Sequence, residues 1–228
     1  MRSASPVRSG HEAEWVADSS TIVVKIGGST FGSGETTLAD VAALRAAGRN
    51  VVLVHGGGAE ITRWLGIHRV ESRFVDGLRV TDEAAIDVVV AVLAGMVNKK
   101  LVAQLDRLGV PALGLCGPDG GVLRGAIEQA ALGLVGEVYA VGAAILHTLL
   151  AAGLVPVIAP IAVERGSDRL LNVNGDTAAG QVAAALSGAR LVFLTDVPGV
   201  LDATGATIAH LDATRSAALR HEGVLKGA

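Results

Sequence analysis

The chain has 228 residues, of which 50% are hydrophobic and 3% aromatic, so its core must be built from Ala, Val, Leu and Ile, as in parallel sheets covered by helices. The formal net charge of -3 provides no basic face, which excludes nucleic acid as an expected partner. A single cysteine, Cys116, excludes an intrachain disulfide, fits a reducing compartment and is interpreted as a core thiol.

Residues 1–20 carry two arginines and three acidic side chains and lack the apolar stretch of a signal peptide. We expect this segment to be a flexible or dimer-covering extension and the protein to be cytoplasmic. The folded domain is expected to begin at residue 21.

The first predicted elements in chain order are two buried strands, at 21–26 and 51–54, separated by a short helix at 38–47. The first strand runs into Gly27-Gly28, and the second runs into His55-Gly56-Gly57-Gly58, after which a helix opens. Glycines at the carboxyl ends of parallel strands let backbone N–H groups approach phosphate oxygens. Both turns are therefore candidate phosphate contacts, although a tight turn alone also requires glycine.

Residues 81–108 predict one long helix, because Asp82 and Glu83 give it an acidic first turn that suits the helix dipole. A strand is expected at 112–116. The sequence Gly-Pro-Asp-Gly-Gly at 117–121 is typical of a turn, and it predicts a lid-like hairpin on the edge of the sheet.

Residues 138–163 are almost free of charge and long enough, on hydropathy alone, to span a bilayer. Gly153, Pro156 and Pro160 interrupt this stretch, which indicates a helix at 142–152 followed by a buried strand at 154–159. We therefore expect two elements of a globular domain and no membrane span.

The C-terminal third continues the alternation of strands and helices. The predicted elements are a strand at 170–174, a helix at 176–186, a strand at 191–195, a turn-rich loop at 196–202, and a helix at 212–221 capped by Asp212. Together with the aliphatic composition, this alternation favours the α/β class with a mainly parallel sheet.

Lys25 is the most informative charge, because it lies inside the first strand, immediately before Ile26 and the glycine pair. An unpaired ammonium group is costly there unless an anion neutralises it. A lysine that extends to solvent, or that pairs with a carboxylate, is the alternative interpretation.

Neither a Walker loop nor a Rossmann fingerprint is present. Five other motifs follow one another along the chain: VKIGG (24–28), VHGGG (54–58), GLRVTD (77–82), NVNGD (172–176) and LTDVPGV (194–200). Their order resembles that of the acetylglutamate kinases of the amino acid kinase family, over the whole length from Thr21 to the C-terminus.

The resemblance implies a three-layer αβα sandwich of the amino acid kinase fold, with an amino-acid-binding lobe at about 21–165 and an incomplete nucleotide-binding lobe at about 166–228. It implies ATP-dependent phosphorylation of the side-chain carboxylate of N-acetyl-L-glutamate, the second step of arginine biosynthesis. It also implies a homodimer that pairs through the helix near 88–98, and a hexamer only if residues 1–20 are helical.

The resemblance further assigns roles to six residues. Lys25 would contact the phosphoryl group in flight, and Asp176 would organise the catalytic lysines without taking a proton. The substrate-binding residues would be Gly57 and Gly58 through their amides, Arg79 through the α-carboxylate, and Asn172 through the acetylamino acid. A surface arginine and a plain helix cap remain the alternatives for Arg79 and Asp176.

A second group of positions would face ATP: Gly27, Gly28, Asp196, Val197, Pro198, Gly199, Val200, Leu201, Val224, Leu225 and Lys226. The histidines are scattered and form no metal-ligand spacing with Cys116, so no protein-held metal is expected and Mg²⁺ should arrive with ATP. His55 could be a base, but a structural place beside the glycines is favoured.

Two departures from the family pattern keep other functions open. The chain ends at Ala228 before the second catalytic lysine of the family, so its C-terminus looks truncated, and Gly175 stands where the family usually has Ala. The alternatives are a kinase for another amino-acid carboxylate, such as free or carrier-linked aminoadipate, and a nucleotide- or amino-acid-binding regulator with weakened catalysis.

Overall fold

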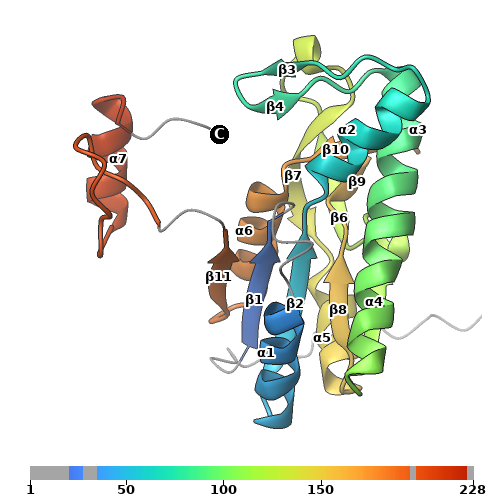
Figure 1. Ribbon diagram of the computed structural model, residues 1–228, viewed down its shortest axis with the longest axis vertical. Helices are drawn as coiled ribbons and strands as arrows, with labels where there is room; N and C mark the ends of the chain where they lie inside the picture. Colours follow the sequence, from blue (N-terminus) through green and yellow to red (C-terminus); the bar gives the residue numbers. More distant parts are fainter. Residues whose placement is uncertain (1–20, 28–34, 196–198, 225–228) are drawn as a thin grey trace, which may run out of the picture.

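The computed structural model describes residues 21–27, 35–195 and 199–224. A five-stranded parallel sheet forms its centre, in the order β11-β1-β2-β8-β5 (Figure 1). The strands of this sheet are β1 (Thr21–Ile26), β2 (Asn50–His55), β5 (Ala112–Leu115), β8 (Val155–Ile158) and β11 (Arg190–Leu194). The α/β class and the parallel central sheet predicted from the sequence are confirmed.

Helices cover both faces of this sheet, which makes the predicted three-layer sandwich. The helices are α1 (Glu35–Ala46), α2 (Gly58–Ile67), α3 (Glu83–Val90), α4 (Asn98–Arg107), α5 (Ala143–Ala151) and α6 (Gly175–Ala185). Side chains of β2 alternate between the layers: Val51 and Leu53 join the core under α1 and α4, while Val52 and Val54 join the core under α5 and α6. This two-residue period explains why the strand is apolar throughout.

The long helix predicted at 81–108 is confirmed as one continuous helical segment from Glu83 to Arg107 that contains a π-helical stretch, Ala91–Val97. Asp82 is its N-cap and accepts a hydrogen bond from the Ala85 amide at 2.9 Å. Thr81 lies outside the helix, in a β-bridge with Gly133. π-Helical turns often occur at functional sites, and this one lies beside the glycine turn that follows β2.

Four strands form a separate closed barrel, which sequence analysis did not predict. They are β6 (Leu123–Ala126), β7 (Val135–Val141), β9 (Ile161–Glu164) and β10 (Leu170–Val173). The hairpin predicted at 117–121 is wrong, because β5 belongs to the central sheet whereas β6 pairs with β7 and β9. A Cβ on Gly117 would lie 2.6 Å from the Ile161 carbonyl oxygen, so glycine here permits a close crossing rather than a chain reversal.

A true hairpin occurs earlier, where β3 (Phe74–Val75) pairs with β4 (Leu78–Arg79). Asp76 and Gly77 form its turn with φ values of 49° and 82°, as in a type I′ turn. Figure 1 shows this hairpin at the end of the molecule to which the strands β1 and β2 point.

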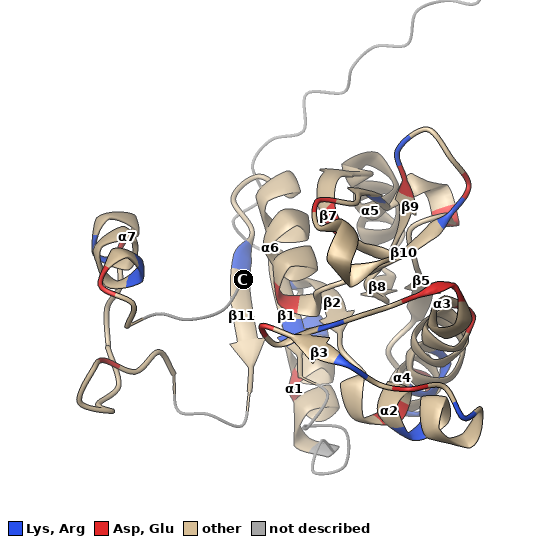
Figure 2. Ribbon diagram, turned by 90° about the horizontal axis from the view of Figure 1, so that it is seen from above, with Lys and Arg blue, Asp and Glu red and all other residues tan. Residues whose placement is uncertain are grey.

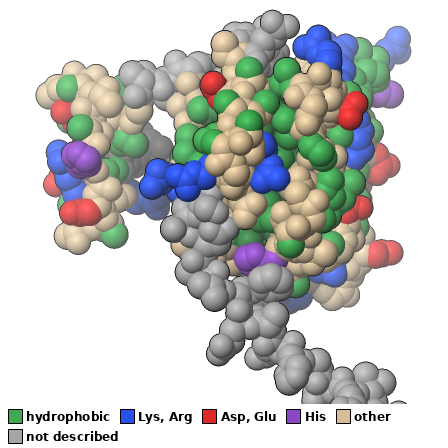
Figure 3. Space-filling view, turned by 90° about the horizontal axis from the view of Figure 1, so that it is seen from below, with side chains coloured by type: hydrophobic (Ala, Val, Ile, Leu, Met, Phe, Trp, Pro, Cys, Tyr) green, Lys and Arg blue, Asp and Glu red, His purple; other side chains and the backbone are tan. Residues whose placement is uncertain are grey.

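The last helix, α7 (Ala213–His221), lies beyond β11 and has no buried residue. Asp212 caps it as predicted, accepting the Arg215 amide at 2.7 Å. The α7 segment stands apart from the layered body in Figures 1 and 2, and Figure 3 shows it as a separate mass beside a body on whose surface apolar side chains are visible.

The apolar stretch at 138–163 folds as separate elements of the globular domain. In the part of the chain that the structure describes, no helix is both long and apolar enough to cross a membrane.

Cys116 is only half-buried, so its assignment as a core thiol is wrong in part. Its Sγ lies 3.3 Å from Asp119 Oδ2. Burial is the larger cause and the Asp119 carboxylate the smaller one of a shift that raises the pKa of the thiol to about 12.

Candidate active site

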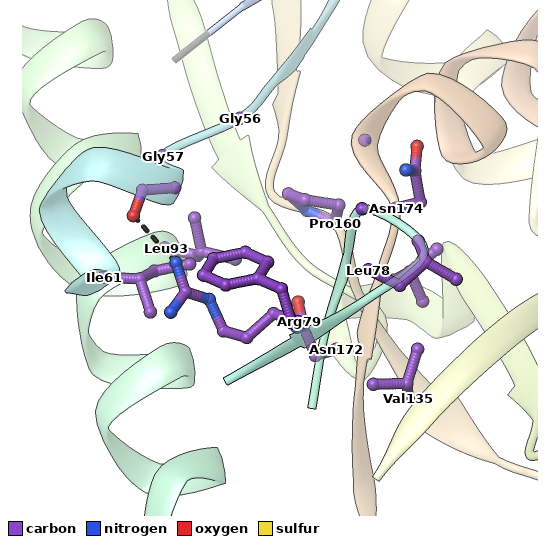
Figure 4. A pocket seen from close by; sticks show the side chains of 15 residues that line it. Gly56, Gly57, Ile61, Leu78, Arg79, Leu93, Val135, Pro160, Asn172 and Asn174 are labelled. Atoms are coloured by element: carbon purple, nitrogen blue, oxygen red, sulfur yellow. Dashed lines mark hydrogen bonds between the residues drawn. The ribbon is translucent and has the colours of Figure 1, made fainter. Parts of the chain in front are cut away.

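A pocket opens at the carboxyl ends of the parallel strands, between segments 56–93 and 135–175 of the chain (Figure 4). Four parts of the chain surround it: the glycine turn after β2, the β3–β4 hairpin, the barrel strand β10 and the start of α6. Its lining includes Gly57, Gly58, Arg79, Asn172 and Gly175. The four residues predicted to bind substrate therefore lie together in one cavity, and such a position is typical of ligand sites in open α/β sheets.

Lys25 and Asp176 form an ion pair beside this pocket. Lys25 Nζ, at the end of β1, lies 2.7 Å from Asp176 Oδ1, and the two side chains are 15% and 55% exposed. The carboxylate pairing that sequence analysis kept as an alternative for Lys25 is thus observed. An ion pair whose carboxylate is about half exposed contributes little to stability. The pair with Asp176 therefore does not by itself account for a lysine in this strand.

The N-cap of α6 is Asn174, and the alternative of Asp176 as a plain helix cap is wrong. Asn174 Oδ1 accepts the amides of Asp176 and Thr177 at 2.8 and 3.2 Å. This leaves the Asp176 carboxylate, in the first turn, available for Lys25. Sequence analysis assigned Asn174 no role, although asparagine two residues before an acidic first turn is a usual capping signal.

Gly175 connects the ion pair with the glycine turn. A Cβ built on Gly175 would lie 3.6 Å from the His55 carbonyl oxygen and 3.8 Å from Lys25 Cε. Both are ordinary van der Waals distances, so Lys25 passes close to the wall of the pocket. An anion bound against Gly57 and Gly175 would therefore be within reach of the ammonium group.

Arg79 is buried, with 7% exposure, so the surface-arginine alternative is wrong. One terminal nitrogen, Nη2, donates to the Gly58 carbonyl at 3.0 Å and to Thr62 Oγ1 at 2.8 Å, and Nη1 donates to Ser72 Oγ. Its guanidinium carbon lies 4.5 Å from the centroid of the Phe74 ring. Desolvation lowers the pKa of Arg79, but the group remains charged, and two of its five N–H donors are left for a ligand.

Asn172 reaches the pocket from β10 and is held by a residue that sequence analysis did not single out. Its Nδ2 donates to Thr81 Oγ1 at 3.0 Å, and that hydroxyl donates to the Arg79 carbonyl at 3.3 Å. Thr81 is fully buried. The amide oxygen of Asn172 is consequently the group that a substrate N–H could approach.

The glycine turn after β2 rests on a buried histidine. His55 is fully buried, its Nδ1 lies 2.8 Å from the Gly56 carbonyl oxygen, and its Nε2 lies 3.1 Å from Asn98 Nδ2. Burial lowers the pKa of His55 to about 4. The hydrogen bond to the Gly56 carbonyl opposes this shift, and the positive charge of Lys99 adds to it. The structural place expected for His55 is observed, and a base with so low a pKa is a poor proton acceptor at neutral pH.

Gly57 also has a packing reason to be glycine. A Cβ at this position would lie 2.7 Å from Leu93 Cδ2, a side chain of the π-helical stretch. The backbone of the turn therefore lies directly against the long helix, and the opposite side of Gly57 lines the pocket.

The predicted nucleotide contacts are only partly described. Gly28, Asp196, Val197, Pro198, Leu225 and Lys226 lie outside the described residues. Gly27 donates its amide to the Leu194 carbonyl at 3.2 Å, while Val200 and Leu201 are 41% and 40% exposed. None of Gly27, Gly199, Val200, Leu201 and Val224 lines the pocket, so the structure does not bring these five into the cavity that holds the substrate residues.

A resident metal has no visible ligand set in the described ranges 21–27, 35–195 and 199–224. No group of three His, Cys, Asp or Glu side chains is close enough to hold an ion. The buried guanidinium of Arg79 in the pocket and the ammonium group of Lys25 beside it are two positive groups that suit an anionic ligand.

Comparisons with known proteins agree with this geometry. The sequence model described as "Amino acid kinase family" matches residues 20–221. The acetylglutamate kinase of Acidiphilium cryptum is 46% identical, covering 91% of this chain and 74% of its own length, and that of Geobacillus stearothermophilus is 45% identical, covering 91% and 80%. The crystal structure of smu.665 from Streptococcus mutans superposes with a TM-score of 0.83 at 27% identity, covering 92% of this chain and 86% of that one.

Proposed function

The chain belongs to the amino acid kinase family, and on this premise we propose that it transfers the γ-phosphoryl group of ATP to the side-chain carboxylate of N-acetyl-L-glutamate. The product is N-acetyl-L-glutamyl 5-phosphate, and the reaction is the second step of arginine biosynthesis. One observation carries the proposal: Gly57, Gly58, a buried arginine and an asparagine line one pocket, and a lysine–aspartate pair lies beside it, in a chain 45–46% identical to two acetylglutamate kinases.

The reaction needs charge neutralisation and alignment rather than a base. A carboxylate oxygen of the substrate attacks the γ-phosphorus, a new P–O bond forms, and the bond to the bridging oxygen of ADP breaks. The substrate carboxylate is already a nucleophile, so no proton has to be removed. In our proposal Lys25 neutralises the transferring oxygens, and Asp176 holds its ammonium group in position to do so.

The substrate would lie between the hairpin and β10. The two uncommitted N–H groups of Arg79 are donors for its α-carboxylate, and the amide oxygen of Asn172 is an acceptor for its acetamido N–H. Gly57 and Gly58 supply backbone amides nearer to the phosphoryl group. An α-carboxylate with an N–H beside it is the feature of N-acetylglutamate that these partners fit.

ATP is the phosphoryl donor in this proposal, and Mg²⁺ enters as part of that substrate. The positions proposed to face the nucleotide are Gly27, Gly28, residues 196–201 and residues 224–226. The proposed lobes, about 21–165 for the amino acid and about 166–228 for the nucleotide, share the central sheet, because β11 pairs with β1. We also propose a cytoplasmic homodimer.

Hydroxylamine trapping tests the function directly. Acyl phosphates react with hydroxylamine to give a hydroxamate, so protein incubated with ATP, Mg²⁺ and N-acetyl-L-glutamate should accumulate hydroxamate and release ADP at equal rates. Faster turnover with 2-aminoadipate or its N-acyl form would favour the aminoadipate-type alternative. Binding of ATP with no hydroxamate from any of these acceptors would overturn the proposal and favour a regulator.

A further inference from the structure

His55 and Asn98 form a buried pair directly beneath the glycine turn. They are 0% and 1% exposed, and neither lines the pocket. Asn98 Nδ2 lies 2.9 Å from the Val157 carbonyl oxygen, while its Oδ1 accepts Lys99 Nζ at 3.1 Å, so the orientation of the amide is fixed. The nitrogen that Asn98 presents to His55 Nε2, at 3.1 Å, is therefore a donor.

This contact determines which histidine nitrogen carries the proton. Because Nε2 accepts from Asn98, the neutral ring must hold its proton on Nδ1. Nδ1 lies 2.8 Å from the Gly56 carbonyl oxygen and donates to it. The carbonyl of Gly56 is thus fixed on the buried side of the turn by a hydrogen bond whose direction Asn98 imposes.

We propose that His55 and Asn98 are positioning residues that set the Gly56–Gly57 peptide, so that the Gly57 N–H faces the transferring phosphoryl group. In a planar trans peptide the C=O and the following N–H point in opposite directions, and the described residues contain no cis peptide. Holding the Gly56 carbonyl on the ring turns the Gly57 N–H away from it. The inference rests on the proposed function, because it names how that site keeps one donor aligned.

The turn needs such a device because its own hydrogen bonds do not fix this peptide. Flanking bonds exist: the Gly56 amide donates to the Ile26 carbonyl at 3.0 Å, and the Gly57 carbonyl accepts the Ile61 amide at 2.9 Å. Among the described residues no carbonyl accepts the Gly57 N–H. A peptide between two glycines rotates readily, and an inverted one would present carbonyl oxygen to a phosphate.

Two substitutions of His55 separate this role from simple packing. His55→Asn places an amide nitrogen near the position of Nδ1, which keeps a donor for the Gly56 carbonyl. His55→Gln fills more of the buried volume and places its amide near Nε2, which keeps the partner for Asn98 but removes that donor. If only packing matters, glutamine should be the milder change.

We expect the reverse in the hydroxamate assay with MgATP and N-acetylglutamate. His55→Gln should lower kcat roughly 100-fold, the loss typical of one preorganised donor, with the KM for N-acetylglutamate within about twofold, because Arg79 and Asn172 are untouched. His55→Asn should keep a kcat at least about tenfold above that of His55→Gln, even if its Tm is lower. A glutamine variant as active as the asparagine variant, or a kcat that follows Tm, would overturn the inference.

A second measurement needs no variant. In ¹⁵N-labelled wild-type protein, the Gly57 amide proton should move downfield when MgADP and aluminium fluoride are added as a mimic of the transferring group. An unchanged resonance would overturn the positioning role. If the wild type shows no turnover, the proposed function fails and this inference fails with it, whereas an active wild type with an unmoved Gly57 resonance removes the inference alone.

Discussion

The site depends on one cation held at the end of a strand. Lys25 Nζ is 2.7 Å from Asp176 Oδ1, and only 15% of the lysine side chain is exposed. The more exposed aspartate balances its charge while the phosphate is absent. In the proposed reaction the lysine is already oriented when the phosphate enters, so little reorganisation is required during the transfer.

Replacing Lys25 should therefore affect turnover rather than folding. We expect Lys25→Ala to lower kcat by two or more orders of magnitude, roughly the loss seen when one preorganised charge partner is removed. The matched variant Arg79→Ala should chiefly raise the KM for N-acetylglutamate, with a smaller effect on kcat. Steady-state kinetics with circular dichroism as a folding control measure both, and unchanged kinetics in the two variants would contradict the site assignment.

The lowered pKa of His55 should make the free energy of unfolding depend on pH. Its pKa is about 4 in the folded protein and near 6.5 when unfolded, so between these values the unfolded state binds the additional proton. Stability should rise from pH 4 to pH 6.5 and gain nothing further from this group above that range, with a total change of about 3 kcal/mol. Urea unfolding across this range measures the change. His55→Asn should flatten that rise, and a variant with the same slope as the wild type would refute the assignment.

At the scale of elements, the first turn of α6 carries the clearest prediction. Gly175 has no positive φ and room for a methyl group, with neighbours at 3.6 and 3.8 Å. Gly175→Ala should stabilise the protein by about 0.4–1 kcal/mol, because alanine reduces the freedom of the unfolded chain at a site that tolerates it. Thermal unfolding measures the gain, with Gly133→Ala as the contrasting control. A Cβ on Gly133, where φ is 72°, would lie 2.4 Å from the Thr81 carbonyl oxygen, so that variant should be destabilised. A destabilised Gly175→Ala would contradict this account.

The elements of the central sheet could be predicted from the sequence because each is a continuous aliphatic run closed by glycine or a cap. β1 was predicted with its observed bounds, and β2, β5, β8 and β11 within about two residues. The barrel strands β6, β7 and β9 could not be predicted, because β6 and β9 have four residues each, while Gly136 and Glu137 interrupt the aliphatic run of the seven-residue β7. The β3–β4 hairpin had a signal that was missed, the Asp76-Gly77 pair typical of a type I′ turn.

Some residues of the candidate site could be predicted from the sequence, and others could not. Lys25, Gly57, Arg79, Asn172 and Asp176 could be named because local motifs carry them, and the structure brings them together. The supporting residues are held by contacts between distant positions, 91 residues apart for the bond from Asn172 to Thr81 and 43 apart for that from Asn98 to His55. No local pattern reports such contacts, so these partners appear only in the folded chain.

At the scale of the whole molecule, the long helix offers the surface for the proposed dimer. Ala91 and Gly95 are exposed and Val88 is partly exposed on this helix, in an uncharged stretch between Asp87 and Lys99. We expect Ala91→Arg to convert a dimer into a monomer in sedimentation velocity, because a buried unpaired charge is costly. Ala217→Arg, at an exposed position of α7, is the matched control. A wild-type monomer, or an Ala91→Arg dimer of unchanged affinity, would count against pairing through this helix.

The most direct test of the account is a crystal structure with MgADP, aluminium fluoride and N-acetyl-L-glutamate. The aluminium fluoride group should lie within hydrogen-bonding distance of Lys25 Nζ and of the Gly57 amide, with the substrate side-chain carboxylate in line with it. A nucleotide whose phosphates bind away from the end of β1 would contradict the claim that the Lys25 ammonium group stabilises the phosphoryl group during transfer.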